Sequence, residues 1–188
     1  NELNGNIPEP GYFDRIYGED HWNYLTIRSL AIGQGELLIT PIQMANMTAT
    51  IANRGYYITP HLIKEIEGTD EIEARFTEKN FTTIDTANYR PIVDGMDLVI
   101  NGGPGSTARN AKIPGITVCG KTGTAQNPHG NDHSIFIAFA PKEDPKIAIA
   151  VYVENQGFGT TYAAPIASLM IEKYLTREVN RTWFENWV

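Results

Sequence analysis

The sequence has a single cysteine, Cys119, among its 188 residues. It therefore cannot form an internal disulfide, and no CxxC pair or Cys/His quartet suggests a zinc site. Basic residues are also scarce, with 15 Lys and Arg against 22 Asp and Glu, which gives a formal net charge of −7. Because nucleic-acid-binding proteins concentrate Lys and Arg on one face, this balance disfavours nucleic acid as a partner.

The sequence also lacks any apolar run that approaches the roughly 18 to 20 residues needed to cross a bilayer. Its N-terminus does not show the basic and then apolar pattern of an export signal. We therefore expect the chain itself to be soluble. It begins in polar sequence at Asn1 without an initiator methionine, so we expect it to be a piece of a longer protein.

The composition that remains is that of a globular protein, with 41% hydrophobic and 20% charged residues. Residues 1–25 carry Asn, Gly, Pro and Asp without a sustained period, which predicts an irregular lead-in. Thr40 and Pro41 are typical of a helix start and Gly55 of a helix end, so a helix is predicted between them. Apolar residues spaced three or four apart predict a second helix over 89–100.

The last third of the sequence is rich in β-branched and apolar residues, which predicts three strands, over 116–124, 134–140 and 147–153. The connections between them are too short for a crossover helix, so the strands are expected to form antiparallel hairpins. The last two strands are almost wholly apolar, which indicates cover on both faces, and a final helix over 161–175 can supply one cover. The predicted fold class is α+β, an antiparallel sheet covered by helices.

The segment GITVCGKTGTAQ, residues 115–126, allows two interpretations. It matches the nucleotide-binding pattern GxxxxGK[ST] letter for letter, and it contains Lys121-Thr122-Gly123, a triad that lines serine acyl-transferase sites. A phosphate loop follows a buried strand and opens a helix. This segment instead follows polar sequence that ends in proline, and it has β-branched residues where the anion nest would be. We therefore predict a strand and keep nucleotide hydrolysis as the less favoured alternative.

On a strand, Lys121 and Gly123 share one face, while Gly120, Thr122 and Thr124 share the other. Gly123 has no Cβ, so it would let the backbone of an extended ligand approach and pair with the strand. The ammonium of Lys121 would attract an anionic group. Taken alone, the triad is better explained as an ordinary strand with an exposed lysine, so its wider context decides.

That context consists of four segments in a fixed order, AIGQGELLITPIQMANMTATIANRGYYITPHLIKEI, GKTGTAQ, DHSIFIAFAPKEDPKIAIAVYVEN and AAPIA. Together they resemble the C-terminal part of the transpeptidase domain of class B penicillin-binding proteins, in particular the elongation-type penicillin-binding protein 2 group. The resemblance runs from Thr26 to Leu175 and implies a fold like that of penicillin-binding proteins and serine β-lactamases, here an incomplete fragment with three main strands. We accordingly expect a lead-in over 1–25, the transpeptidase segment over 26–176 and a tail over 177–188.

By this resemblance the parent protein is a D,D-transpeptidase that cross-links peptidoglycan stem peptides and is acylated by β-lactams. Lys121 and the Thr122 hydroxyl would hold the terminal carboxylate of the donor peptide. Gly123 would lie beside the substrate, and Thr124 would give its backbone N–H to the oxyanion hole. His133, in a loop that the resemblance places at the site mouth, is a secondary candidate for a substrate contact. No cofactor is implied.

The catalytic motifs are incomplete. The family uses an SxxK motif, an SxN motif and K[ST]G, and only the last occurs here, because no lysine has Ser or Thr three residues before it. Thr86-Ala87-Asn88, the segment nearest to SxN, is better explained as a helix cap. We therefore expect no nucleophile, no transpeptidase activity and no acyl-enzyme in this chain alone. The alternative from another class is a peptide-binding module without chemistry.

The resemblance also implies surroundings for the parent. It would be anchored by an N-terminal helix at the periplasmic face of the bacterial inner membrane, with a glycosyltransferase and the elongation machinery as partners. Two further strands of the parent would pair with the strand over 147–153. Without them that strand is an open edge, so self-association of the chain is expected.

Two other features have ordinary explanations. His129, Asp132 and His133 lie in a polar hairpin without convincing third and fourth ligands, so no metal site is expected. The terminal segment TWFENWV is either an exposed aromatic cluster or a packed tail.

Overall fold

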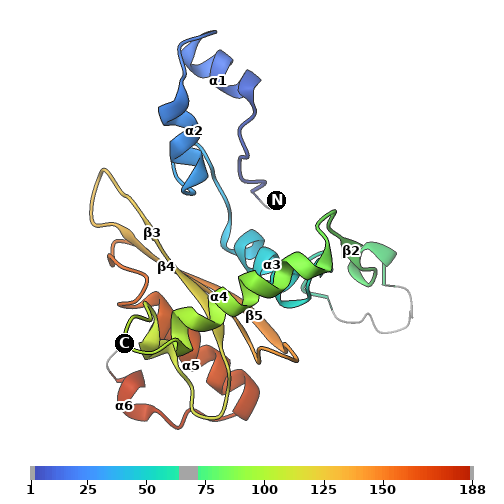
Figure 1. Ribbon diagram of the computed structural model, residues 1–188, viewed down its shortest axis with the longest axis vertical. Coiled ribbons are helices and arrows are strands. Elements are labelled where there is room, and N and C mark those ends of the chain that lie inside the picture. The colour runs from blue at the N-terminus through green and yellow to red at the C-terminus, as the bar shows by residue number, and fades with distance from the viewer. Residues whose placement is uncertain (1–2, 64–71, 187–188) are drawn as a thin grey trace. The chain divides into compact units, whose positions relative to one another are not determined.

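The computed structural model describes residues 3–63 and 72–186 (Figure 1). Contacts divide the chain into two compact units, Asn1–Thr40 and Pro41–Val188. Within the described residues, no helix combines the length and the apolar character needed to cross a membrane.

The first unit contains two short helices, α1 (Pro10–Tyr17) and α2 (Tyr24–Ala31). The prediction of an irregular lead-in over 1–25 is therefore wrong for α1 and for the start of α2. Helix α1 buries Phe13, whose ring centroid lies 5.4 Å from that of Trp22. Both helices have eight residues, little more than two turns, so they are shorter than the window over which an apolar period can be detected.

The second unit begins with α3 (Pro41–Ala52), which confirms the predicted helix. Gly55 follows its end with φ +117°, a conformation that side-chain-bearing residues rarely adopt. The second predicted helix is also confirmed as α4 (Tyr89–Asn101). Between these helices lie a two-stranded antiparallel ribbon and three-residue 3₁₀ turns; they are β1 (Tyr56–Tyr57), β2 (Asn80–Phe81), η1 (Ala74–Phe76) and η2 (Thr86–Asn88).

The main sheet has the strand order β3-β4-β5 and is antiparallel throughout. Its strands are β3 (Cys119–Ala125), β4 (His133–Ala140) and β5 (Ile147–Val153). Both predicted hairpins are confirmed. The first strand was predicted to begin at residue 116, but Gly115 has φ +77° and the chain makes a tight turn between Ile113 and Ile116. The strand therefore begins three residues later than predicted.

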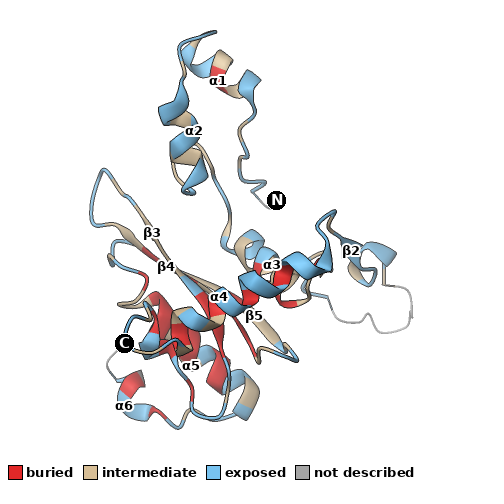
Figure 2. Cartoon of the chain, in the orientation of Figure 1, coloured by how far each residue is buried: buried red, intermediate tan, exposed pale blue. Residues whose placement is uncertain are grey.

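Helices cover both faces of this sheet (Figure 1). On one face, α5 (Ala163–Thr176) packs against Phe136 and Ala138, which are fully buried. On the other face, residues of α3 and α4 form a second buried cluster with Cys119 and Phe139 (Figure 2). The predicted α+β class and the helical cover on both faces are thus confirmed.

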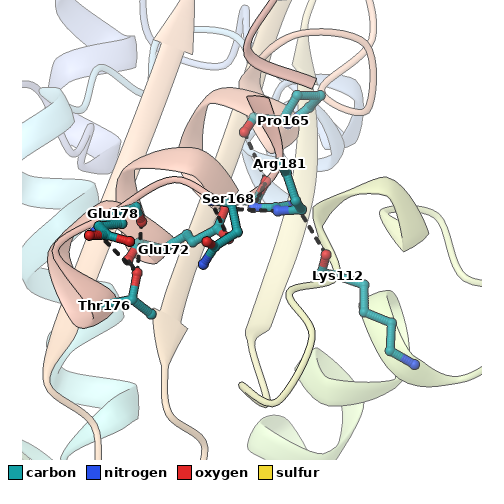
Figure 3. A network of polar contacts seen from close by, with 8 residues as sticks. Lys112, Pro165, Ser168, Glu172, Thr176, Glu178 and Arg181 are labelled. Atoms are coloured by element: carbon teal, nitrogen blue, oxygen red, sulfur yellow. Dashed lines mark hydrogen bonds and ion pairs between the residues drawn. The ribbon is translucent and has the colours of Figure 1, made fainter. Parts of the chain in front are cut away.

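The C-terminal tail is held to α5 by a buried ion pair (Figure 3). Arg181 Nε lies 2.9 Å from Glu172 Oε2, and Arg181 Nη1 donates to Lys112 O at 3.1 Å. A short helix follows, α6 (Thr182–Glu185), in which Trp183 is exposed and Phe184 is buried. The tail is therefore packed through one aromatic side chain and exposed through another.

Candidate functional site

Lys121 lies in the middle of β3, paired in register with Ile137 of β4. The strand continues to Ala125, so no helix begins after the lysine as a phosphate loop would require. The structure thus confirms the predicted strand and contradicts the nucleotide-binding alternative. The Lys121 side chain is exposed, and its Nζ donates to the backbone oxygen of Thr122 at 2.8 Å.

The two glycines around Lys121 are explained first by packing within the sheet. A Cβ on Gly120 would lie 2.5 Å from Cζ of Phe136, so glycine leaves room for that buried ring. A Cβ on Gly123 would lie 3.2 Å from Cβ of Ile135, its partner on β4. Both glycines therefore let β3 lie close to β4. The approach of a ligand backbone to Gly123 stays a prediction.

Strand β3 is an edge of the described sheet, because only β4 pairs with it. Lys121 and Thr122 are successive residues, so their side chains leave the strand on opposite faces. Both can reach one anion only if that anion lies beside the free edge of β3. The same edge offers unpaired backbone N–H and C=O groups to an extended peptide. The position of Lys121 and Thr122 thus favours a ligand that lies along this edge.

Lys121 differs from Lys142, a lysine whose ion pairs stabilise the fold. Lys142 Nζ lies 2.8 Å from Asp94 Oδ1 and 2.9 Å from Asp97 Oδ2, and hydrogen bonds to these carboxylates raise the pKa of Lys142. Within 3–63 and 72–186, no carboxylate lies within ion-pair distance of Lys121. Its ammonium is therefore available for an external anion.

The thiol of Cys119, two residues before Lys121, is not suited to nucleophilic chemistry. It is fully buried at the start of β3. Burial is the main cause that raises the pKa of Cys119 to about 12. A thiol with this pKa stays protonated at neutral pH, and the thiolate is the reactive form.

The segment proposed as a helix cap, Thr86–Asn88, forms η2, although Asp85 supplies the capping oxygen.

His133 begins β4, and its side chain holds the loop after β5. Its Nδ1 accepts a hydrogen bond from Asn155 N at 3.1 Å, and its ring centroid lies 5.2 Å from that of Tyr152. The described part of the chain contains no group of three or more His, Cys, Asp or Glu that could hold a metal ion. A contact between His133 and substrate stays a prediction.

One part of the site was not found from the sequence. Gly159, in the loop between β5 and α5, lies against the backbone of β3 at Gly123 and of β4 at Ile135. No motif marks this approach, although the glycines Gly157 and Gly159 are a signal for close packing of backbone.

A separate hollow of about 880 Å³ lies at the C-terminal end of α5, lined by Met170 and Tyr174 among others. Because α5 covers the sheet face opposite to Lys121, this hollow is not part of the β3 site.

Comparison with known proteins gives a consistent result. The chain matches the family model "Penicillin binding protein transpeptidase domain" over residues 6–172. It is 32% identical to the peptidoglycan D,D-transpeptidase MrdA of Haemophilus influenzae, covering 95% of this chain and 30% of that protein.

Two solved structures are also similar. Pseudomonas aeruginosa PBP2, solved in complex with WCK 5153, superposes with a TM-score of 0.81 and 36% identity over 93% of this chain and 39% of that one. Penicillin-binding protein A of Mycobacterium tuberculosis, solved as an imipenem acyl-enzyme, gives a TM-score of 0.64 and 34% identity over 78% of this chain and 33% of that one. The chain thus spans about a third of the length of the proteins it matches.

Proposed function

The chain belongs to the penicillin-binding protein transpeptidase domain family, and from this membership we propose that it is the C-terminal part of a peptidoglycan D,D-transpeptidase. The parent enzyme would cross-link stem peptides during cell-wall synthesis and would be acylated by β-lactams. The observation that carries the proposal is Lys121, which is the exposed residue of an edge strand and has no carboxylate partner among the described residues.

The chain's own residues would bind the substrate. The ammonium of Lys121 and the hydroxyl of Thr122 would hold the terminal carboxylate of the donor peptide at the free edge of β3. A hydrogen bond to a charged group contributes about 1.5–3 kcal/mol. An extended peptide beside β3 would add main-chain hydrogen bonds, with Gly123 alongside it and Thr124 giving its N–H to the developing oxyanion.

The nucleophile would come from the rest of the parent enzyme. Loss of the nucleophile in a serine acyl-transferase costs on the order of a million-fold in rate. We therefore expect this chain alone to bind an anionic peptide end without reacting with it. The acyl-enzyme of the Mycobacterium tuberculosis relative supports acylation as a property of the parent.

The test is labelling with a fluorescent penicillin. We expect no covalent label on the 188-residue chain and stoichiometric label on the longer protein that contains it. In the longer protein, Lys121→Ala should lower the rate of labelling by about 10- to 100-fold, the factor that corresponds to one charge-assisted contact. Lys112→Ala is the matched control, because this lysine is also exposed and its substitution removes the same charge.

Labelling of the chain alone, or an unchanged rate in Lys121→Ala, would contradict the proposal. A peptide-binding module without chemistry is the second candidate, and it is favoured if the longer protein binds peptide but takes no label. No binding of ATP with magnesium is expected, because the backbone at Lys121 is an extended strand.

The surroundings of the parent belong to the same proposal. A membrane-anchored enzyme at the periplasmic face of the bacterial inner membrane would work with a glycosyltransferase and the elongation machinery. The similarity to PBP2 supports this placement. In the described sheet, β5 pairs only with β4, so its other edge is open to a further strand of the parent or to another copy of the chain.

A further inference from the structure

The loop between β5 and α5 touches β3 on the face opposite to Lys121. Gly159 in this loop is buried, and a Cβ placed on it would lie 2.1 Å from Ile135 O in β4, 2.6 Å from Gly123 O and 3.1 Å from Gly123 N. Real Cβ atoms essentially never approach other atoms more closely than 3.0 Å. The loop backbone therefore lies directly over the pair formed by Gly123 of β3 and Ile135 of β4, at the glycine of the Lys-Thr-Gly triad.

Three consecutive carbonyl groups fix this loop, each through a donor from a different element. Phe158 O accepts a hydrogen bond from Ser134 Oγ of β4 at 2.9 Å. Gly159 O accepts one from Ala164 N, in the first turn of α5, at 2.9 Å. Thr160 O accepts one from Asn110 Nδ2, in η3 (Arg109–Ala111), at 2.7 Å. A segment held in this way has little freedom to move away from β3.

Ser134 connects the loop to the strand that carries the site. It is fully buried and pairs in register with Thr124. Its hydroxyl donates to Phe158 O and accepts from Ala163 N at 3.2 Å. A buried hydroxyl is costly unless it is hydrogen-bonded, and here both of its roles are used. The hydroxyl of Ser134 therefore links β4 to the loop between β5 and α5.

We propose that the segment Phe158–Thr160 is a buttress that fixes the backbone of β3 at Gly123 and Thr124, with Gly159 and Ser134 as positioning residues. The positioning of β3 does not depend on the proposed function. Its effect on substrate binding does, because the proposed function makes Thr124 the residue whose backbone contacts the substrate. A displacement of about 1 Å at such a position can cost roughly 100-fold in rate.

Two glycines of the same loop supply a test and its control. Gly159→Ala places a methyl group against the backbone of Ile135 and of its partner Gly123, whereas Gly157→Ala strains a residue with φ +70° but meets nothing within 4 Å. In amide spectra and hydrogen exchange of the chain, Gly159→Ala should shift the signals of Gly123 and Thr124. It should also speed exchange of the Gly123 amide by about tenfold, the effect of losing one strand hydrogen bond to β4. Gly157→Ala should change only signals of the loop.

Ser134→Ala provides an independent variant if Gly159→Ala does not fold. It removes the donor to Phe158 O without adding volume. It should also shift the amide signals of Gly123 and Thr124 and speed exchange of the Gly123 amide. The proposal is overturned if Ser134→Ala and any folded Gly159→Ala leave these amides at their wild-type positions. It is also overturned if Gly157→Ala changes them to the same extent.

A peptide titration separates this inference from the proposed function. A synthetic peptide ending in D-alanyl-D-alanine should bind Gly159→Ala, or Ser134→Ala, about tenfold more weakly than the wild type, and Gly157→Ala normally. If the wild type binds no peptide, the proposed function fails while the amide data still decide the buttress. Wild-type affinity in the variants together with shifted amides would refute the consequence for the substrate.

Discussion

Substitution of Arg181 by alanine should destabilise the chain severely, because it leaves Glu172 charged and buried. The two side chains are 10% and 3% exposed, and Arg181 Nε lies 2.9 Å from Glu172 Oε2. The guanidinium also donates to Lys112 O at 3.1 Å and to Ser168 Oγ at 3.3 Å (Figure 3). The substitution therefore removes the partner of a buried carboxylate and a link between the tail and the segment that leads into β3.

Removing one partner of a buried ion pair costs about 3–5 kcal/mol. Native proteins are stable by only about 5–15 kcal/mol, so this loss is a large part of the total. For a protein of this length it corresponds to a fall in Tm of roughly 6–20 °C. Urea denaturation followed by tryptophan fluorescence would measure the change in the free energy of unfolding, and calorimetry would measure the change in Tm.

The control for Arg181→Ala is the exposed ion pair between Lys146 and Asp144, whose side chains are 56% and 78% exposed. Lys146→Ala should change the free energy of unfolding by no more than about 1 kcal/mol. Replacing both buried partners, as in Arg181→Met with Glu172→Leu, should restore most of the stability because no charge is left unpaired. The reasoning is refuted if Arg181→Ala lowers stability no more than Lys146→Ala does.

Three further predictions follow from contacts within the second unit. Because burial raises the pKa of Cys119 to about 12, its thiol should not react with a disulfide reagent at pH 8 until the chain unfolds; rapid reaction under native conditions would contradict this. The hydrogen bond from Lys142 lowers the pKa of Asp94, so this carboxylate stabilises the fold above its unfolded pKa, and that contribution disappears as the pH falls through the lowered value. Asp94→Asn should therefore flatten the loss of stability in acid, and an unchanged pH profile in urea denaturation would rule the contribution out. The open edge of β5 should cause the isolated chain to dimerise or aggregate, and a monomer by light scattering at all concentrations would exclude this.

The sequence predicted those parts of the fold that depend on local pattern. The hairpins of β3, β4 and β5 follow from runs of β-branched residues joined by short connections, and α3 follows from its proline start and glycine end. Helix α1 was missed because two turns give too little periodicity, and its packing depends on tertiary contacts such as that of Phe13 with Trp22.

The residues of the candidate site could be predicted from the sequence, but the groups that surround them in the fold could not. The Lys-Thr-Gly triad and its strand were found from sequence, whereas the absence of a carboxylate near Lys121 among the described residues is a property of the folded chain. The contact of Gly159 with Gly123 joins residues that are distant in sequence, so no local sequence pattern predicts it. Gly123 was interpreted as a place for ligand approach, and the structure adds its packing against Ile135.

The most direct test of the central claim is a titration of the 188-residue chain with a peptide that ends in D-alanyl-D-alanine, followed by amide chemical shifts. We predict shifts at residues 121–124. We also predict a loss of affinity of about 10- to 100-fold either in Lys121→Met or when the peptide carboxylate is replaced by an amide. Equal binding of the amidated peptide, or shifts confined to residues away from β3, would contradict the account.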